Sequence, residues 1–350
     1  MFFRKQKRPV GCDIGSYSVK IVELKPIKKG EYELLHLGIK DLPPDTIVDG
    51  AIIDRIPVAN AIKAIYEEQK IKNRKIATSI SGHSVIIKRV NVPAQREDEL
   101  EESIEWEVEQ YIPFDLSEVN LDYQVVKTNP DDGSMDVLVV AVKKEKIEDQ
   151  VSVINLAGKE AALIDVDAFA LHNAFLYNYP DASSLVTVLL NIGASITNLV
   201  IVKGEEVMFT RDLSVGGNQY TSYLQKGLGV SYEDAEKLKK GELTSDSISM
   251  DEVNNIINQV SETLELELRK TFDFFKTANG VDRIDRILIS GGAVHTKGLI
   301  EFLSERFKLP IEVFNSFKRI SYNPAEFPKS KLGEISPKVA VAMGLAMRNL

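Results

Sequence analysis

The residue types best suited to chemistry in this 350-residue chain lie in three glycine-containing turns, each of which follows an apolar segment. The first turn spans 13–20 and contains Asp13, Gly15, Ser16, Ser18 and Lys20. A glycine between two strands lets the backbone approach a ligand closely, and successive N–H groups in such a turn can cradle phosphate oxygens. The serine hydroxyls add donors, and the lysine ammonium adds a point charge that suits phosphate. The turn is therefore a candidate phosphate-binding loop; the alternative is an ordinary hairpin turn with surface serines.

A second turn repeats this order of residue types about 180 residues later, with Asn191, Gly193, Ser195 and Thr197. The repeat suggests a duplicated chain whose two similar lobes face each other across a cleft. In that arrangement the second turn could grip phosphates from the opposite side, although a plain hairpin remains the alternative here too.

The third turn is Ser290-Gly291-Gly292, which could pass close to a flat base or a sugar. Two side chains at strand ends are candidate metal ligands. Asp13 could hold hydrated Mg²⁺, which takes few carboxylates and keeps several waters, and Asn191 could contribute through water. The chain contains no Walker A sequence, so any phosphate site must be built from these turns.

The composition excludes several classes of function. Lys and Arg number 43 against 52 Asp and Glu, and the resulting net charge of −9 argues against a nucleic-acid-binding protein. The single cysteine, Cys12, allows no internal disulfide and fits a reducing compartment. Four scattered histidines provide no transition-metal cluster. No apolar run reaches the roughly 18 residues of a membrane-spanning helix, and the N-terminus lacks a signal-peptide pattern.

The elements that must position the turns alternate between strands and helices, which indicates an α/β fold. Alternating or continuous apolar runs predict strands, and apolar residues at helical spacing predict helices. The expected strands are 10–25 (a pair), 75–92, 121–127, 135–143, 162–166, 185–191, 199–202, 206–211, 286–290 and 311–313. The expected helices are 51–69, 95–112, 144–157, 168–176, 218–228, 231–239, 251–278, 299–307 and 337–348, with a loop over 320–337 before the last.

The three turns, in this order, resemble the two phosphate loops and the adenosine loop of the actin-like ATPase superfamily, which includes actin, sugar kinases, heat-shock 70 chaperones and FtsA. Within it the chain most resembles the PilM family of type IV pilus assembly proteins. The motifs that carry this resemblance are 13–20, 105–114 with its Tyr-Ile-Pro-Phe ending, and 235–239. The match extends over essentially the whole chain.

The resemblance implies a two-lobe actin-like ATPase fold, with duplicated ribonuclease H-like halves and a small inserted α/β subdomain. The implied division is 1–83 with 164–184 for the first lobe, 84–163 for the insertion, 185–336 for the second lobe and 337–350 for a closing helix. It also implies binding of ATP with Mg²⁺. Gly216 and Gly217 would border the nucleotide, and Glu236 and Lys239 would contact ribose and adenine.

Asp167 falls where some relatives place the acid that orients the attacking water, so it is a candidate general base. Two departures from the family pattern weaken the expectation of catalysis. Asn191 is an amide where many relatives have Asp, and Ala194 replaces a residue that is acidic in actin. We therefore expect ATP binding with slow or absent hydrolysis.

The PilM resemblance implies a cytoplasmic protein held at the inner membrane face by its partner. That partner is the N-terminal cytoplasmic peptide of a PilN-type membrane protein, bound in a groove between the first lobe and the insertion. Candidate contact residues are Trp106, Tyr111, Pro113 and Phe114; the alternative is a solvated acidic face over 97–109 with Trp106 packed on a loop. Contacts with pilus motor ATPases and self-association stay open. The main competing hypothesis is an FtsA-like polymer-forming ATPase, and a small-molecule kinase is disfavoured because no polar sugar-binding cluster is evident.

The N-terminus carries a basic tip, Arg4, Lys5, Lys7 and Arg8, behind Phe2 and Phe3. The sequence permits two interpretations, a disordered solubilising tail or a weak contact with an anionic membrane or acidic partner.

Overall fold

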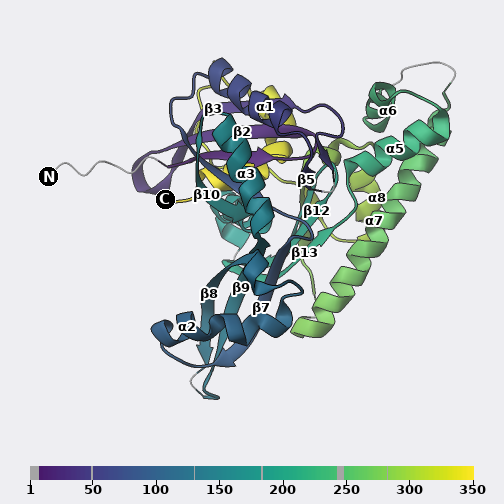
Figure 1. The fold of residues 1–350 in the computed structure, drawn as a ribbon. Helices are drawn as coiled ribbons and strands as arrows, with labels where there is room; N and C mark the ends of the chain where they lie inside the picture. The colour runs from purple at the N-terminus through teal and green to yellow at the C-terminus, as the bar shows by residue number, and fades with distance from the viewer. Residues whose placement is uncertain (1–7, 49, 130, 183, 243–247, 282) are drawn as a thin grey trace.

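The computed structural model describes residues 8–48, 50–129, 131–182, 184–242, 248–281 and 283–350. Two α/β lobes lie side by side, and a smaller subdomain projects from the first (Figure 1). The C-terminus lies on the side of the first lobe that faces away from the second lobe (Figure 1).

The first lobe is built on a five-stranded sheet of order β10-β6-β1-β2-β3. Strands β1, β2 and β3 form an antiparallel meander, and β6 and β10 add in parallel to β1. The central strands are buried on both faces, which explains their nearly continuous apolar sequences. The bounds are β1 (Val10–Ile14), β2 (Ser18–Pro26), β3 (Tyr32–Asp41), β6 (Lys75–Ile80) and β10 (Glu160–Val166).

The second lobe repeats this sheet with the order β13-β12-β11-β14-β15. Its first three strands are again an antiparallel meander, followed by two parallel strands. The bounds are β11 (Val186–Ile192), β12 (Thr197–Lys203), β13 (Glu206–Leu213), β14 (Arg286–Ser290) and β15 (Ile311–Val313). The expectation of two similar halves is confirmed.

Helices cover both sheets. Those next to the first sheet are α1 (Arg55–Glu68), α3 (Lys144–Leu156), α4 (Asp167–Asn178) and α10 (Ala340–Ala346); the others are α5 (Gly217–Leu228), α6 (Tyr232–Lys239), α7 (Met250–Asn279), α8 (Leu299–Phe307) and α9 (Lys329–Ile335). In α7 the expected apolar stripe from Val253 to Phe275 is buried in the second-lobe core, as the helical spacing predicts.

Two expected boundaries are wrong. The helix expected over 51–69 begins only at Arg55, because Ala51–Ile52 (β5) pairs with Ile47–Val48 (β4) and Asp54 then caps the helix by accepting a hydrogen bond from the Ile56 N–H at 2.9 Å. The loop expected over 320–337 contains the short helix α9, which buries Leu332.

Helices α4 and α10 cross tightly at the junction of the lobes. A Cβ on Gly344 of α10 would lie 1.7 Å from the Ala170 carbonyl oxygen of α4, so only glycine fits this crossing. A Cβ on Gly11 of β1 would likewise lie 2.0 Å from the Ala342 oxygen. The core around these helices includes Leu189 and Val200 of the second sheet together with Val22 of the first. The two lobes therefore share one core at their junction.

The projecting subdomain has a three-stranded sheet of order β7-β9-β8. Its strands are β7 (Val85–Pro93), β8 (Val119–Asn129) and β9 (Ser134–Lys143), and helix α2 (Glu97–Val108) covers one face. Leu100, Ile104 and Val108 of α2 are buried against Val137 and Val139, which leaves the acidic side of the helix in solvent.

The segment after β9 returns to the first lobe. Val153 and Ile154 of α3 and Ala157 are buried in the first-lobe core with Ile62 and Ile76. We therefore propose that the inserted subdomain ends near Lys143, earlier than position 163.

Candidate functional site

The three glycine turns meet in one cleft between the lobes. A cavity there is lined by first-lobe residues that include Asp13, Gly15, Ser16, Lys20 and Asp167, and by second-lobe residues that include Asn191, Gly193, Gly291 and Gly292. A neighbouring cavity of about 590 Å³ is lined by Ser16, Ser195 and Gly216. Ser18 and Thr197 are buried and line neither cavity. Thr197 donates its hydroxyl to the Val215 carbonyl at 2.6 Å.

The first turn holds a cation over its own backbone. Asp13 and Lys20 are opposite one another in the β1–β2 register, and their side chains form an ion pair at 3.2 Å, each 15% exposed. A Cβ on Gly15 would lie 2.7 Å from Lys20 Nζ, so glycine gives the ammonium room above the turn. The Gly15 N–H donates to the Ser18 carbonyl at 3.1 Å, which closes the turn. This places a cation at the point where phosphate oxygens would enter.

The second turn is locked to the start of helix α5. The N–H groups of Gly217 and Asn218 donate to the carbonyls of Gly193 and Ala194 at 2.9 and 2.7 Å. A Cβ on Gly216 would lie 2.5 Å from the Ala194 oxygen, so this close approach requires glycine. The turn's carbonyls are therefore bound inside the protein, and the positive end of the α5 dipole lies beside it, an arrangement that favours an anionic ligand.

Of the two glycines in the third turn, the backbone geometry requires only Gly291. Gly291 has φ +93°, and a Cβ there would lie 2.2 Å from the Ile192 oxygen. A Cβ on Gly292 would meet no atom within 4 Å, because this residue faces open space in the cleft. The Gly291 N–H donates to the Pro337 carbonyl at 2.8 Å and so ties the turn to the C-terminal segment.

Glu236 and Lys239 of helix α6 form a compact polar cluster beside these turns. Lys239 Nζ pairs with the Glu236 carboxylate and donates to the Thr221 hydroxyl at 2.9 Å, and the Thr221 hydroxyl also donates to Glu236. Burial lowers the pKa of Lys239, although the Glu236 carboxylate offsets part of this effect. A Cβ on Gly217 would lie 3.4 Å from Ala293 Cβ and 3.6 Å from Lys239 Nζ, so this cluster borders the third turn.

Asp167 stands at the start of α4, in the floor of the cleft. It accepts a hydrogen bond from the Ser79 hydroxyl at 2.6 Å. Burial, and then the nearby Asp13 carboxylate, raise the pKa of Asp167 to about 7, while hydrogen bonds from Ser79 and Ser81 act in the opposite direction. A carboxyl group with this pKa can hold or accept a proton near neutral pH, which suits a general base.

Several cleft residues escaped the sequence-based prediction. The same cavity is lined by Ser79, Ser81, Gln150, Asn198 and Lys338. Gln150 Oε1 is buried and has no hydrogen-bond partner in the described part of the chain. Lys338 brings a cation from the C-terminal segment. Only the Ser-Ile-Ser-Gly run at 79–82, directly after an apolar strand, could have signalled part of this set.

These residues fit a magnesium nucleotide better than a protein-bound metal. Among the described residues, no group of three or more His, Cys, Asp or Glu side chains lies close enough to hold a metal ion. Asp13 and Asn191 nevertheless line one cavity with Asp167, and Mg²⁺ is commonly held by one or two carboxylates, waters and substrate phosphates. The unpartnered Gln150 oxygen and the open face of Gly292 leave room for a polar ligand.

A chain of hydrogen bonds leads out of this cleft to the root of the inserted subdomain. The Asn191 amide donates to the Asn198 carbonyl oxygen at 2.9 Å, and the Asn198 amide donates to Asp212 Oδ1 at 2.9 Å. Asp212 Oδ2 accepts from the Gly82 N–H at 2.6 Å, across the gap between the lobes. Next to it, His83 Nε2 lies 2.9 Å from the Ser214 hydroxyl.

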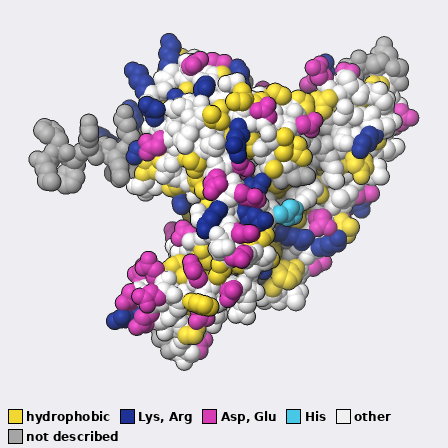
Figure 2. Space-filling model, in the orientation of Figure 1, with side chains coloured by type: hydrophobic (Ala, Val, Ile, Leu, Met, Phe, Trp, Pro, Cys, Tyr) yellow, Lys and Arg dark blue, Asp and Glu magenta, His cyan; other side chains and the backbone are white. Residues whose placement is uncertain are grey.

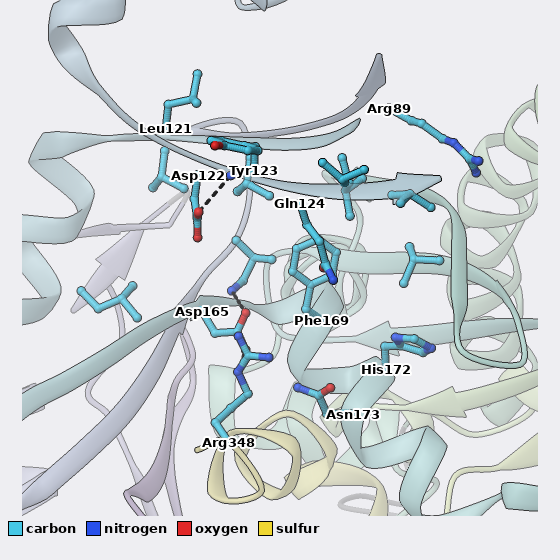
Figure 3. Close-up of a pocket in the computed structure, with 18 of the residues that line it drawn as sticks. Arg89, Leu121, Asp122, Tyr123, Gln124, Asp165, Phe169, His172, Asn173 and Arg348 are labelled. Carbon is cyan, nitrogen blue, oxygen red and sulfur yellow. Dashed lines mark hydrogen bonds and ion pairs between the residues drawn. The ribbon is translucent and has the colours of Figure 1, made fainter. Parts of the chain in front are cut away.

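A second, larger cavity of about 1020 Å³ lies between the inserted subdomain, α4 and the C-terminal segment (Figure 3). Strand β8 forms one wall with Leu121, Asp122, Tyr123 and Gln124, while Phe169 and His172 of α4 form the opposite wall (Figure 3). Its other lining residues include apolar side chains such as Val140 and Val142 and charged side chains such as Lys127 and Glu205. We call this cavity the β8 groove.

One ion pair stands in the floor of the β8 groove. Arg348 Nε lies 3.0 Å from Asp165 Oδ2, and the Val166 N–H donates to Asp165 Oδ1 at 2.8 Å. Burial raises the pKa of Asp165, and the Arg348 charge offsets part of that shift.

None of Trp106, Tyr111, Pro113 and Phe114 lines the β8 groove. Trp106 is 78% exposed on α2, and Phe114 packs in the core of the subdomain with Lys143 Nζ 4.7 Å from its ring centre. A partner contact through these four residues, elsewhere on the subdomain, stays a prediction.

Two similar lobes around a cleft of glycine turns define an actin-like ATPase fold. Solved structures of low sequence identity share it. The ethanolamine utilization protein EutJ from Carboxydothermus hydrogenoformans is 14% identical with a TM-score of 0.59, over 97% of this chain and 89% of that one. MreB5 of Spiroplasma citri bound to AMPPNP is 14% identical with a TM-score of 0.53, over 97% and 94%.

A family model described as type IV pilus assembly protein PilM matches residues 11–350, so the chain belongs to this family. A solved PilM-PilN type IV pilus biogenesis complex is 27% identical with a TM-score of 0.86, over 97% of this chain and 98% of that one. The cell division protein FtsA of Bacillus subtilis (strain 168) is more distant, at 22% identity over 309 residues, 80% of this chain and 67% of FtsA. The protein is thus an actin-like protein of type IV pilus assembly, as its turns led us to expect. In the described residues, no helix is both long and apolar enough to cross a bilayer.

Proposed function

We propose that this protein is a nucleotide-dependent scaffold, which binds Mg-ATP in the cleft and the N-terminal cytoplasmic peptide of a PilN-type membrane protein in the β8 groove. The observation that carries the proposal is the hydrogen-bond chain from Asn191 through Asp212 to Gly82. It joins the nucleotide cleft to the root of the subdomain that forms one wall of the groove.

The nucleotide part rests on the chemistry of the cleft. Lys20 and the glycine turns suit phosphates, and the Glu236–Lys239 cluster beside Gly217 suits ribose and base. Bound Mg²⁺ would supply charge neutralisation for the phosphates, with Asp13 and Asn191 as its nearest candidate side chains. Asp167 would act as the base, but Asn191 and Ala194 leave the second lobe without a carboxylate at this turn, so we expect hydrolysis to be slow.

The peptide part rests on the shape and lining of the β8 groove. Strand β8 is an edge strand of the small sheet, with exposed backbone polar groups that an extended peptide could pair with. The apolar lining residues provide area for alternate side chains of the peptide, and a volume of about 1020 Å³ accommodates several of them. The relative of known structure with 27% identity is a complex of PilM with PilN, which supports a partner of this type.

Calorimetric titration of the full chain with Mg-ATP, and then with a PilN-type N-terminal peptide, tests both parts. We expect Lys20→Ala to weaken ATP binding at least tenfold, because it removes the phosphate cation, while Lys25→Ala on the same strand leaves binding unchanged. We expect Val125→Asp, at a groove position 39% exposed, to weaken peptide binding, and Val313→Asp, 44% exposed on β15, to leave it unchanged.

Three results would contradict the proposal. Absence of ATP binding by the unmodified chain would remove the nucleotide part. ATP binding without peptide binding, together with ATP-dependent filaments, would favour the FtsA-like alternative instead. Equal effects of Val125→Asp and Val313→Asp would place the peptide outside the β8 groove.

A second partner contact is proposed for the exposed face of α2. Trp106 stands among acidic residues there, and aromatic side chains dominate the energetics of many interfaces. Because Trp106 lies outside the groove, Trp106→Ala should leave the affinity for the PilN-type peptide unchanged while weakening binding to a motor ATPase. Unchanged binding of the motor would remove this second contact.

A further inference from the structure

Five cationic side chains gather at one end of the first-lobe sheet. They are Lys70, Lys72, Arg74, Lys75 and Lys159, and we call this set the basic end. The carboxyl ends of β1, β6 and β10 reach the cleft, whereas Lys75 and Glu160 begin β6 and β10, so the basic end lies at the opposite edge of the sheet. The Glu160 N–H donates to the Arg74 carbonyl at 2.9 Å, which brings the two basic segments side by side.

Among the described residues, the cations of the basic end form no close ion pair, although the Glu67 carboxylate acts on Lys159 from a longer distance. None of the five forms an ion pair with any residue that the structure describes. Burial, and then the nearby charge of Arg74, lower the pKa of Lys159, whose ammonium lies 4.0 Å from the centre of the Tyr66 ring. In a protein with a net charge of −9, such a set is a local excess of positive charge.

Charge is separated along the molecule. Lys and Arg side chains gather along the upper left edge of the first lobe, and Asp and Glu side chains gather on the inserted subdomain below (Figure 2). Helix α2 accounts for much of the acidic end, since the stretch 97–109 has eight acidic residues in thirteen. An anionic surface would therefore attract one end of the protein and repel the other.

The N-terminal basic tip joins the chain at this place. The described chain begins at Arg8, whose carbonyl accepts a hydrogen bond from the Asn73 amide at 2.7 Å, inside the segment that carries the basic end. The Arg8 guanidinium donates to the Met347 carbonyl, next to Arg348 of the β8 groove. The preceding residues, which include Arg4, Lys5 and Lys7, lie outside the described residues.

We propose that the basic end is a contact surface for an anionic phospholipid bilayer. The inference rests on the proposed function in one respect, since a membrane partner would hold the protein near such a surface. Clustered lysines with an arginine suit the acidic headgroups of such a surface. The acidic insertion then points away from the lipid.

Vesicle co-sedimentation of the full chain tests the proposal. We expect binding to vesicles of phosphatidylcholine with about one third phosphatidylglycerol, no binding to phosphatidylcholine alone, and weaker binding as salt is raised. Charge reversal at Lys70, Lys72 and Lys75 to Glu should weaken binding at least tenfold, since each lysine near the surface is worth about fivefold. A matched reversal at the exposed residues Lys226, Lys276 and Lys308 of the second lobe should change it less than twofold.

Three other results of these experiments would overturn the proposed membrane contact. Equal binding to neutral vesicles, or equal losses in both triple variants, would overturn it, because the effect would then be hydrophobic or due to net charge alone. Equally tight binding of duplex DNA would overturn it in favour of a general polyanion site. Peptide titration separates this result from the proposed function. The basic-end variant should still bind the PilN-type peptide, and a chain that binds vesicles but no peptide would remove only the peptide partner.

Discussion

At the scale of single residues, the cleft contains ion pairs in which each charge offsets the other, and a carboxyl group whose pKa is raised by burial. Lys20 is held over the first turn by Asp13, and Lys239 is held by Glu236. Asp167 is the exception, since burial and a neighbouring carboxylate disfavour its charged form. This makes the unliganded cleft sensitive to pH.

The raised pKa of Asp167 predicts how stability depends on pH. An ordinary carboxyl group near 3.8 in the unfolded chain and near 7 in the fold binds more protons when folded, so stability should fall as pH rises between these values. In nucleotide-free protein with EDTA, the unmodified chain should lose stability from pH 5 to pH 8 and Asp167→Asn should not. The free energy of unfolding of the variant, relative to the unmodified chain, should therefore increase by roughly 2–3 kcal/mol over this range. Denaturant unfolding at both pH values measures this.

Asp181→Asn, at an exposed carboxyl group, serves as the control and should show no such change with pH. A difference between Asp167→Asn and the unmodified chain that stays constant from pH 5 to pH 8 would contradict the prediction.

At the scale of elements, the crossing of α4 and α10 sets the relation between the lobes. Helix α4 begins with Asp167 in the cleft and carries Phe169 in the β8 groove, so its position affects both candidate sites. Its contact with α10 has no space for a side chain at Gly344.

We predict that Gly344→Ala lowers the stability of the protein by about 2–4 kcal/mol, because the new Cβ must push α10 away from the Ala170 oxygen. Gly333→Ala in α9 is the matched control. A Cβ there meets nothing within 4 Å, and alanine favours the helix by about 1 kcal/mol. Scanning calorimetry should show a lowered Tm for the first variant and an unchanged or raised Tm for the second. Equal Tm values would mean that the crossing is not as tight as described.

At the scale of the whole molecule, some of the polar contacts that join the lobes and the insertion lie close to the cleft. Asp212 of β13 accepts from Asn198 in its own lobe and from Gly82 in the other. Arg89 of β7 also reaches Glu206 of the second lobe at 2.7 Å. A change in the cleft can therefore reach the subdomain through a defined set of groups.

We predict that Asp212→Asn uncouples the two sites. The two contacts use different carboxylate oxygens, and the amide replaces one of these oxygens with an NH₂ group that cannot accept, so one of the two hydrogen bonds is lost. If ATP changes the affinity of the unmodified chain for the peptide by about fivefold or more, a typical coupling, the variant should reduce this ratio towards one while both ligands still bind. Peptide titration with and without ATP measures the ratio.

Asp273→Asn, at an exposed aspartate of α7, should keep the full ratio and is the control. Equal peptide affinities with and without ATP in the unmodified chain would show that no coupling exists to be lost.

The amino-acid sequence by itself determined the local features of this protein. The glycine turns, the apolar stripe of α7 and the duplicated order of residue types are short-range patterns, because backbone freedom and side-chain spacing act over a few residues. They were enough to indicate the fold class and a cleft, while the family came from the resemblance of 13–20, 105–114 and 235–239 to PilM proteins. Boundaries such as the start of α1 at Arg55 were missed, because a two-residue strand pair outweighed the helical spacing before it.

Only the tertiary structure decided which distant residues meet. Gln150 and Lys338 enter the cleft from a helix after the insertion and from the C-terminal segment, and neither has a local pattern that marks it. The Asp212–Gly82 contact and the β8 groove depend on how the lobes and the insertion are placed. The unpaired cations from 70–75 and Lys159 come together because β6 and β10 are neighbours in the sheet. Such arrangements follow from the path of the whole chain and its shared core, which no short stretch of sequence encodes.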